Sequence, residues 1–329
     1  MQARRIAIVA LLALLIPQLS LALEELSQEA ALKWLQKMGQ ALHDLNYDGV
    51  FVYQHGDQLT AMRLIHGHDE LGEQERLVSL TGTSREVIRN NDQVTCILPD
   101  TRSVIVERKG QSKPGFPYLL PKQIQQISDV YTFELGHRGR VAGRDAQQVR
   151  ILPKDQYRYS YHLWLDQDTG MLLKAELLNG KDVVEQFMFT HLTFMKAVSD
   201  SLFNPDIDHK DFLSYHHEQR KENAPVTVTD QNWQVDNLPT GFELTHHQYQ
   251  FQADHSDPVQ HLVYSDGLST VSIFIEKLGP DQAAMQGPSP MGAVHAYSKM
   301  IDHTQITAVG EVPATTVKLI AESVHYTGQ

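Results

Sequence analysis

Histidine is the residue type in this chain most able to do chemistry, with 17 copies among 329 residues. The closest pairs in the sequence are His66 with His68, His216 with His217, and His246 with His247. A zinc site needs three or four ligands that converge, with partners that orient them. The chain contains no HExxH, CxxC or His-x-x-x-His motif, and a His-x-His pair without a third nearby ligand is a weak signal. We therefore expect surface histidines, and the sequence predicts neither a metal site nor a cofactor.

A catalytic nucleophile is not indicated either. No GxSxG motif occurs, and the single cysteine, Cys96, stands beside Ile97 and Leu98 in a strand-like run, which is typical of a buried, inert thiol. Neighbouring carboxylates such as Asp166 and Asp168 lie in turn sequence, where aspartate is a structural choice. The glycines of "GHRGRVAG" open no helix, as a phosphate-binding loop would require. The sequence therefore predicts a protein that is not an enzyme.

Positive charge gathers locally at Arg138, Arg140 and Arg144 in a chain that is otherwise acidic. With 28 Lys and Arg against 40 Asp and Glu, the formal net charge is −12 at pH 7. That charge argues against a nucleic-acid partner, and a bound lipid would have to be held by shape and apolar contact. The three arginines are a candidate site for an anionic head group. The alternative is a solvated hairpin edge.

The first 22 residues have the layout of a secretory signal peptide. Arg4 and Arg5 precede an apolar run from Ile6 to Ile16, and small residues precede a cleavage site after Ala22. An uncleaved anchor is the alternative, but a spanning helix needs about 20 apolar residues and this run is shorter. The sequence therefore predicts export and a soluble mature protein.

The elements that follow are one helix and then a long series of strands. Apolar residues recur at three- and four-residue spacing over residues 26–45, which predicts an amphipathic helix. Runs such as "YDGVFVYQHGDQLTAMRLIHG" and "SREVIRNNDQVTCILPD" read as hairpins, and "PKQIQQISDV" reads as a short helix. This order predicts an α+β domain in which helices cover one face of a meandering antiparallel sheet.

The chain is expected to divide into two domains. Residues 205–227 are charged and lack sustained periodicity, so we interpret them as a linker between an N-terminal domain, residues 23–204, and a C-terminal domain, residues 228–329. The second domain is also expected to be α+β, with a mobile loop from Leu278 to Met291 and a closing helix in "GEVPATTVKLIAESV".

Several strands of the first domain are apolar on both faces, although a sheet with one wet side should alternate. One face can lie under the N-terminal helix, and the other needs another cover. That cover is either another part of the same protein or a bound acyl chain or apolar peptide. For the second case we expect a groove lined by Val50, Val52, Met62, Leu64, Leu163, Leu165, Phe187 and Phe189. This list takes one of the two sets of alternating residues in each strand, because a register shift of one residue would exchange the two faces.

The strand motifs together resemble those of the RseB/MucB family of anti-sigma-factor regulators. "GRVAGRDAQQVRILPKD", "YRYSYHLWLDQDTGMLLKAELL" and "VVEQFMFTHLTF" carry the resemblance in the first domain. "LPTGFELT", "VYSDGLSTVSIFIEK" and "ITAVGEVPATTVKLIAESV" carry it in the second. The resemblance extends over essentially the whole mature chain, and its motifs belong to the scaffold.

The resemblance implies a fold and a function. It implies a large half-open antiparallel β-barrel of the LolA type, covered by helices, with a smaller α+β domain behind it. It also implies a periplasmic protein that binds the periplasmic domain of the anti-sigma factor RseA/MucA and shields it from the site-1 protease DegS or its counterpart. Lipopolysaccharide, or another acylated ligand, would displace it.

Two other functions compete with this one. A lipid or lipoprotein carrier of the LolA type would use the same apolar sheet without a protein partner, but such a carrier ends after the first domain. A periplasmic hydrolase or metalloprotein is opposed by the missing motifs. The oligomeric state is left open between a monomer and a homo-oligomer.

Overall fold

The computed structural model describes residues 26–108, 124–217, 232–250, 258–279 and 282–328. The predicted signal peptide and cleavage site lie outside these residues. Within the described part, no helix is both long enough and apolar enough to span a bilayer.

The described chain begins with a helix over residues 26–44, as the spacing predicts. Its buried stripe is Ala31, Leu35, Met38 and Leu42, each at most 4% exposed. These positions recur every three or four residues, so they share one face, which packs in the main apolar core. Leu26, at the start, is 63% exposed. The helix is therefore held by one face only, along its middle and its end.

Twelve strands form one large sheet. They are β1 Asn46–His55, β2 Gln58–Asp69, β3 Gly72–Ser79, β4 Glu86–Asn90, β5 Gln93–Leu98, β6 Ser103–Arg108, β7 Tyr131–Val141, β8 Arg144–Pro153, β9 Ser160–Asp166, β10 Leu172–Asn179, β11 Asp182–Met195 and β12 Leu213–His217. Their order in space is β12-β6-β5-β4-β3-β2-β1-β11-β10-β9-β8-β7. All neighbours are antiparallel except β12 and β6, which are parallel.

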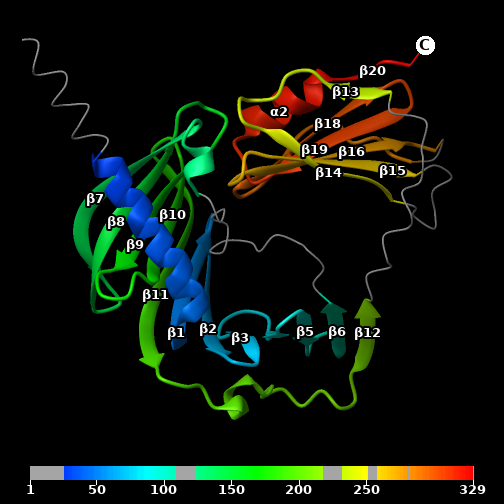
Figure 1. Ribbon diagram of the computed structural model, residues 1–329. Helices are drawn as coiled ribbons and strands as arrows, with labels where there is room; N and C mark the ends of the chain where they lie inside the picture. The colour runs from blue at the N-terminus through cyan, green and yellow to red at the C-terminus, as the bar shows by residue number, and fades with distance from the viewer. Residues whose placement is uncertain (1–25, 109–123, 218–231, 251–257, 280–281, 329) are drawn as a thin grey trace, which may run out of the picture.

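The sheet curves around the N-terminal helix and stays open (Figure 1). Its two edges, β12 and β7, are not paired with each other in the described chain. The N-terminal helix crosses the concave side, and the segment predicted as a second helix forms the short 3-10 helix η1, Ile124–Ile127. The observed domain is thus an open curved sheet with a single long α-helix in its hollow.

The hairpin turns fall where the sequence predicts them. Gly56, with φ of 55°, turns the chain between β1 and β2. Asn91, with φ of 52°, turns it between β4 and β5. Glycine and asparagine tolerate this left-handed backbone better than other residues do, which is why they mark such turns.

The second part of the chain is a six-stranded antiparallel sheet with one helix against it. Its elements are β13 Trp233–Val235, β14 Glu243–Gln250, β15 Val259–Ser265, β16 Thr270–Lys277, β17 Gly287–Met291, β18 Val294–Ile301, β19 Thr304–Gly310, α2 Ala314–Ser323 and β20 Val324–Tyr326. The six strands have the order β14-β15-β16-β19-β18-β17, and β13 pairs with β20. Helix α2 buries Val317, Ile320 and Ala321 against the sheet, as predicted for the closing helix.

Two segments are more ordered than the sequence suggests. Strand β17 occupies the end of the predicted mobile loop and pairs with β18. Strand β12 lies inside the predicted linker and extends the large sheet beside β6. Strand pairing is non-local, so neither strand leaves a clear periodicity in its own short sequence.

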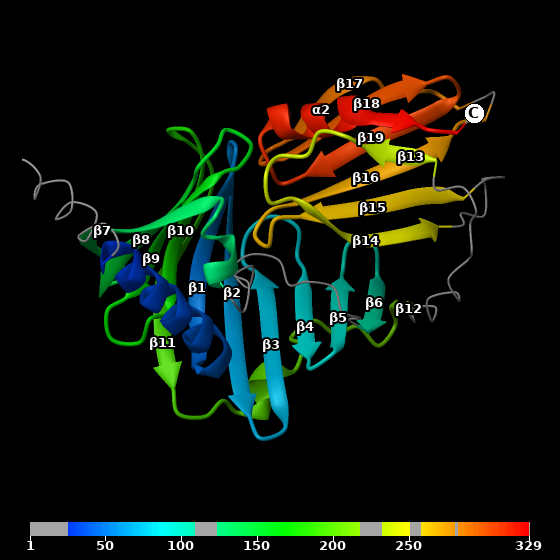
Figure 2. The same cartoon turned by 45° about the horizontal axis from the view of Figure 1, so that its top comes forward.

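The second part sits over the ends of the strands of the first (Figure 2). The turn between β15 and β16 makes this contact through Asp266, which is 7% exposed. Its carboxylate accepts hydrogen bonds from the guanidinium of Arg158 and, at 3.0 Å, from the hydroxyl of Tyr131. The side chains of Arg158 and Asp266 are both fully buried, and Arg158 also donates to the carbonyl of Thr240.

Two more contacts come from the residues beside Arg158. The hydroxyl of Tyr159 lies 3.0 Å from the carbonyl oxygen of Ala293 and 3.1 Å from that of Val312. The hydroxyl of Thr316 donates to the carbonyl of Tyr157 at 2.8 Å. Leu268 and Ala293 of the second part pack into the apolar core of the first part. The two parts therefore share both polar and apolar contacts.

Candidate functional site

A cavity of about 440 Å³ lies within the large sheet and beneath the end of the N-terminal helix. Its apolar wall is formed by Leu42 of the helix and by strand residues and their neighbours: Tyr47, Phe51, Leu64, Leu77, Val87, Tyr161, Met171, Leu172, Ala175, Leu177, Phe187 and Phe189. Tyr53 adds an aromatic ring with a polar tip. A cavity of this size and lining can hold an acyl chain or a few apolar side chains of a peptide.

The pairing of the strands decides which residues reach the cavity. Phe51 of β1 is opposite Met62 of β2 and Phe189 of β11, so these three side chains share a face. Val50 and Val52 are the neighbours of Phe51 and point to the other face. The predicted grouping of Val50 and Val52 with Leu64 and Phe187 is therefore corrected, because β1 is apolar on both faces and its alternation alone does not fix the parity.

The other predicted groove residues lie on the cavity side of the sheet. Leu64, Phe187 and Phe189 line the cavity itself. Leu163 and Leu165 are at most 1% exposed and belong to the core, while Met62 packs against that core. These residues support the wall or form it, and the structure does not test their role in binding.

Aromatic rings missing from the predicted set form much of the wall. The ring centroid of Phe51 lies 4.8 Å from that of Phe187 and 5.9 Å from that of Phe189. Tyr53 follows on the same face two residues later. The available signal was that Phe51 and Tyr53 alternate with Val50 and Val52, so the sequence predicts both rows and leaves open which one faces inward.

The polar groups of the cavity wall are mostly carboxylates. Among the described lining residues, Glu75, Glu176, Glu185 and Glu311 are acidic and Arg89 is the basic one. Arg89 is already paired with Glu75 at 2.9 Å. The wall is thus suited to a neutral or cationic occupant and unfavourable for a phosphate group.

Glu185 has partners within its own domain. Its carboxylate accepts a 2.6 Å hydrogen bond from the hydroxyl of Tyr53 and lies 2.8 Å from Nδ1 of His55. The same His55 ring fills the space where a Cβ on Gly292, in the turn between β17 and β18, would lie. Gly292 has φ of 64°, so close approach and backbone conformation both favour glycine there.

Glu311 reaches the cavity from the second domain. It lies between Gly310, at the end of β19, and Val312, whose carbonyl contacts Tyr159. Its carboxylate has no hydrogen bond or salt bridge among the described residues. Burial, and then the charge of Glu185, raise the pKa of Glu311 to about 7. Sequence reasoning missed it, because Glu311 meets the cavity only through the docking of the two domains.

The predicted head-group arginines differ in their surroundings. Arg144 is engaged: its Nε donates to Asp166 at 2.5 Å and its guanidinium lies 4.7 Å from the ring centroid of Phe194. Burial tends to raise the pKa of Asp166, but hydrogen bonds from Arg144 and Thr169 outweigh it and the pKa is lowered. Arg138 and Arg140 are exposed on the β7–β8 hairpin, and Arg140 donates to the carbonyl of Gly143. Of the three predicted arginines, Arg138 and Arg140 are exposed and Arg144 is half-buried.

The single cysteine lies in β5 and is half-buried. Burial raises the pKa of the Cys96 thiol, so little thiolate forms at neutral pH. This environment agrees with the expectation of an inert thiol.

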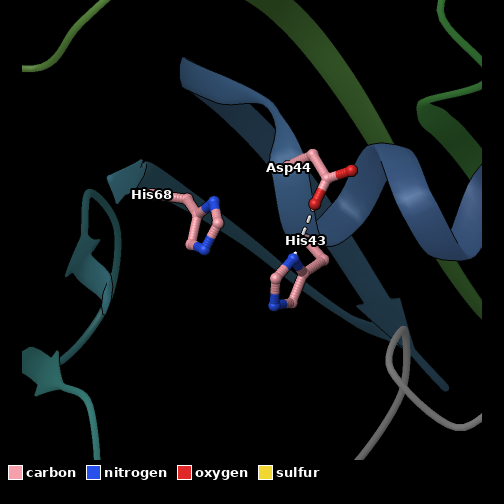
Figure 3. Close-up of side chains that lie close together, drawn as sticks. All are labelled: His43, Asp44 and His68. Atoms are coloured by element: carbon pink, nitrogen blue, oxygen red, sulfur yellow. Dashed lines mark hydrogen bonds and ion pairs between the residues drawn. The ribbon is translucent and has the colours of Figure 1, made fainter. Parts of the chain in front are cut away.

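One group of possible metal ligands is occupied internally. His66, Glu73 and Glu75 lie close together, but Nδ1 of His66 is 2.7 Å from the carbonyl oxygen of Leu45 and Nε2 is 3.0 Å from Glu73. Both ring nitrogens therefore have protein partners. A second group, His43, Asp44 and His68, is more open (Figure 3).

A curved sheet that holds an apolar cavity, with a second domain docked at its end, defines a two-domain binding protein. Residues 30–207 match the model of the MucB/RseB N-terminal domain, and residues 227–325 match that of the MucB/RseB C-terminal domain. The chain therefore belongs to the MucB/RseB family.

Relatives of known name agree with this membership. The sigma-E factor regulatory protein RseB of Haemophilus influenzae is 29% identical over 308 residues, which cover 92% of each chain. The sigma factor AlgU regulatory protein MucB of Pseudomonas aeruginosa is 30% identical over 299 residues, 88% of this chain and 89% of that one.

Solved structures agree as well. The structure of the MucA/MucB complex of Pseudomonas aeruginosa matches with a TM-score of 0.70 at 28% identity, covering 91% of this chain and all of the matched chain. A crystal structure of MucB in complex with MucA(peri) matches with a TM-score of 0.69 over the same share of this chain.

Proposed function

We propose that this chain is a periplasmic negative regulator of an envelope-stress sigma factor, which acts by binding and not by catalysis. It binds the periplasmic domain of a membrane-spanning anti-sigma factor of the RseA/MucA type and shields that domain from site-1 proteolysis. An acylated ligand such as lipopolysaccharide releases it, and cleavage near Ala22 delivers it to the periplasm.

The names and titles of the relatives support the partner. The matched relatives are named as regulatory proteins of sigma-E and AlgU, and two of the matched structures are complexes of MucB with MucA. The crystal structure of MucB in complex with MucA(peri) supports a periplasmic location of the partner domain. The export signal in the sequence is consistent with a meeting in that compartment.

The observation that carries the proposal is the apolar cavity whose wall includes residues of both domains. Leu64 and Phe187 come from the large sheet, and Glu311 comes from the second domain. An acyl chain that enters this space would contact both domains. A ligand releases a partner only if it binds the free protein better than the complex. A ligand in a cavity at the domain contact would bind the free protein and the complex with different affinities if the partner changes how the two domains pack.

The carboxylates of the cavity wall indicate which part of a lipid would enter the cavity. Acyl chains suit the apolar lining, while phosphate groups would meet Glu185 and Glu311 inside. We therefore place a head group outside the cavity, with Arg138 and Arg140 as candidates because their guanidinium groups are exposed. Arg144 is a weaker candidate, since binding there would compete with Asp166.

A lipid or lipoprotein carrier of the LolA type is the second candidate function. The apolar cavity favours it equally, because a carrier needs the same surface. The docked second domain favours the regulator, since a carrier of that type has no use for a domain that contributes Glu311 to the wall.

A binding and protection experiment separates the two functions. The mature chain is titrated with the periplasmic domain of the anti-sigma factor from the same organism, and cleavage of that domain by the site-1 protease is followed with and without the chain. The regulator predicts saturable binding, slower cleavage, and restored cleavage on addition of lipopolysaccharide. Lipid binding with no binding of the anti-sigma domain would establish the carrier instead.

A further inference from the structure

Three side chains that can bind metal meet where the N-terminal helix ends against β2. His43 and Asp44 are the last two residues of the helix, and His68 lies near the end of β2 (Figure 3). One ligand atom from each residue lies within 4.8 Å of the other two. We propose that these three residues form a binding site for a divalent transition-metal ion of the Zn²⁺ type.

The donor set suits such an ion. Two imidazoles and one carboxylate are ligands that Zn²⁺ accepts, and water would complete a tetrahedral shell. Ligand atoms of a tetrahedral zinc ion are about 3.3 Å apart, since each lies about 2 Å from the metal. Rotation of the exposed His43 and Asp44 side chains would have to close the remaining distance. His43 and Asp44 have side chains that are 60% and 64% exposed, so an ion can reach them from solvent.

The two imidazoles have nitrogens available for the metal. The rings of His43 and His68 are 4.5 Å apart at their centroids. Nδ1 of His43 is 2.7 Å from Oδ1 of Asp44, so these two atoms face the same space, and an ion bound there would replace the hydrogen bond between them. Neither ring nitrogen of His68 has a hydrogen-bond partner in the described chain.

The surrounding backbone also favours a cation. The end of a helix carries the negative pole of its dipole, together with carbonyl groups that lack partners within the helix. The position of His68 is fixed by Asn46, whose Oδ1 accepts the backbone N–H of His68 at 2.7 Å and whose Nδ2 donates to the carbonyl of Lys196. His66, on the same face of β2, holds the carbonyl of Leu45 just after the helix. Helix end and strand are thus fixed relative to each other before any ion binds.

Other histidine clusters of the described chain lack this arrangement. His246 and His247 are neighbours in sequence, but Nε2 of His247 is 3.0 Å from the Gln260 amide, and no carboxylate joins them. His261 has Gln248 and Ser272 as partners. The pair His246 and His247 is therefore a matched control for non-specific metal binding.

The test is a zinc titration of the full, untagged protein recovered from the periplasm. Competition with a chromophoric chelator should give one saturable equivalent of Zn²⁺. His68→Ala and Asp44→Asn should each weaken the affinity at least tenfold, and His246→Ala with His247→Ala should leave it unchanged. Because the ion would join the helix end to β2, zinc should also raise the melting temperature of the wild type and not that of His68→Ala.

Cobalt gives an independent readout of geometry. Co²⁺ in the same site should show the strong visible absorption of a four-coordinate ion, and Asp44→Asn should alter that spectrum. Asp44 is exposed, so this variant should fold even if His68→Ala does not. The proposal is overturned if the wild type binds no equivalent of zinc, if the site variants bind as tightly as the wild type, or if only the control pair weakens binding.

Discussion

The pKa of Glu311 depends on the contact between the two domains. Its carboxyl has no hydrogen-bond or ion-pair partner among the described residues and lies in the cavity wall beside Glu185 from the other domain. Its pKa of about 7 lies above the value of 4.5 for an exposed glutamate. The docked protein therefore keeps a proton on Glu311 in a pH range where the unfolded chain has lost it.

The first prediction is a pH dependence. Between about pH 4.5 and 7 the unfolded chain ionises at Glu311 and the folded chain does not, so the free energy of unfolding should fall as the pH rises through this range. Glu311→Gln removes that titration. We expect it to melt like the wild type near pH 4.5 and at a higher temperature than the wild type near pH 8. Equal slopes of melting temperature against pH in both proteins would contradict a buried carboxyl at this position.

The second prediction concerns the two faces of β1 and its neighbours. Leu64 lines the cavity and Val52 points to the other face. Leu64→Asp adds a fifth carboxylate to an acidic wall and should weaken binding of an acyl ligand at least tenfold. Val52→Asp should leave that binding unchanged, because its carboxylate lies on the outer face. Titration with a fluorescent fatty acid measures both, and a loss of binding in Val52→Asp alone would reverse the assignment of the faces.

Residue types could be predicted at the cavity better than residue positions could. The sequence predicts apolar rows on both faces of β1, and in the structure Leu64, Phe187 and Phe189 line the cavity while Val50 and Val52 point to the other face. It does not reveal that the register between β1 and β11 shifts between Val50 and Phe51. A bulge of this kind changes the twist and the pairing of the strands, but the alternation of residue types in the sequence does not show it.

At the scale of elements, the turn between β15 and β16 has a second role. Residues 263–277 follow a strand–turn–strand pattern without a catalytic motif, and β15 and β16 form that hairpin. Asp266 in that turn caps it through the backbone N–H groups of Leu268 and Ser269 and also accepts from Arg158. The turn is therefore both a structural turn and the polar centre of the domain contact.

The third prediction tests this contact. Asp266→Asn leaves the fully buried Arg158 without its main counter-charge and should lower the stability of the docked form by about 3–5 kcal/mol. The double variant Arg158→Met with Asp266→Leu should lose less, because both buried charges are gone. Urea unfolding of the three proteins measures the difference. A single variant as stable as the wild type would mean that the pair is not buried.

Elements whose signal is local were the predictable ones. The N-terminal helix has a buried stripe at helical spacing, and the closing helix follows Pro313. Strands β12 and β17 were missed because their stability depends on pairing with β6 and β18. Charged or proline-containing segments look like loops until a partner strand is known.

At the scale of the molecule, the contact between the domains is larger than the sequence suggests. The polar segment 205–227 predicts two units with little to hold them together. Instead, Tyr131, Arg158 and Tyr159 of the first domain bind the second, and Leu268 and Ala293 enter the first core. Such a contact joins residues far apart in the chain, so no local pattern predicts it.

The fourth prediction follows for proteolysis. We still expect the first cuts within residues 205–227, the segment predicted to join the domains, although β12 within it pairs with β6. The two fragments should then elute together from a gel-filtration column, held by the buried contact. With Asp266→Asn they should separate. Early cleavage within residues 130–195 would contradict the proposed boundary between the domains.

The shared core has a consequence for how an exported chain matures. Leu268 and Ala293 belong to the core of the first domain, and Tyr159 bonds to the carbonyl of Val312. The first domain therefore cannot complete its packing until nearly the whole chain is present, which under the proposed export means until it has crossed the membrane. During that interval its cavity and its apolar rims are open to water and to other proteins. Under the proposed export, the newly translocated chain would need a periplasmic chaperone or fast translocation to avoid misassembly during that interval.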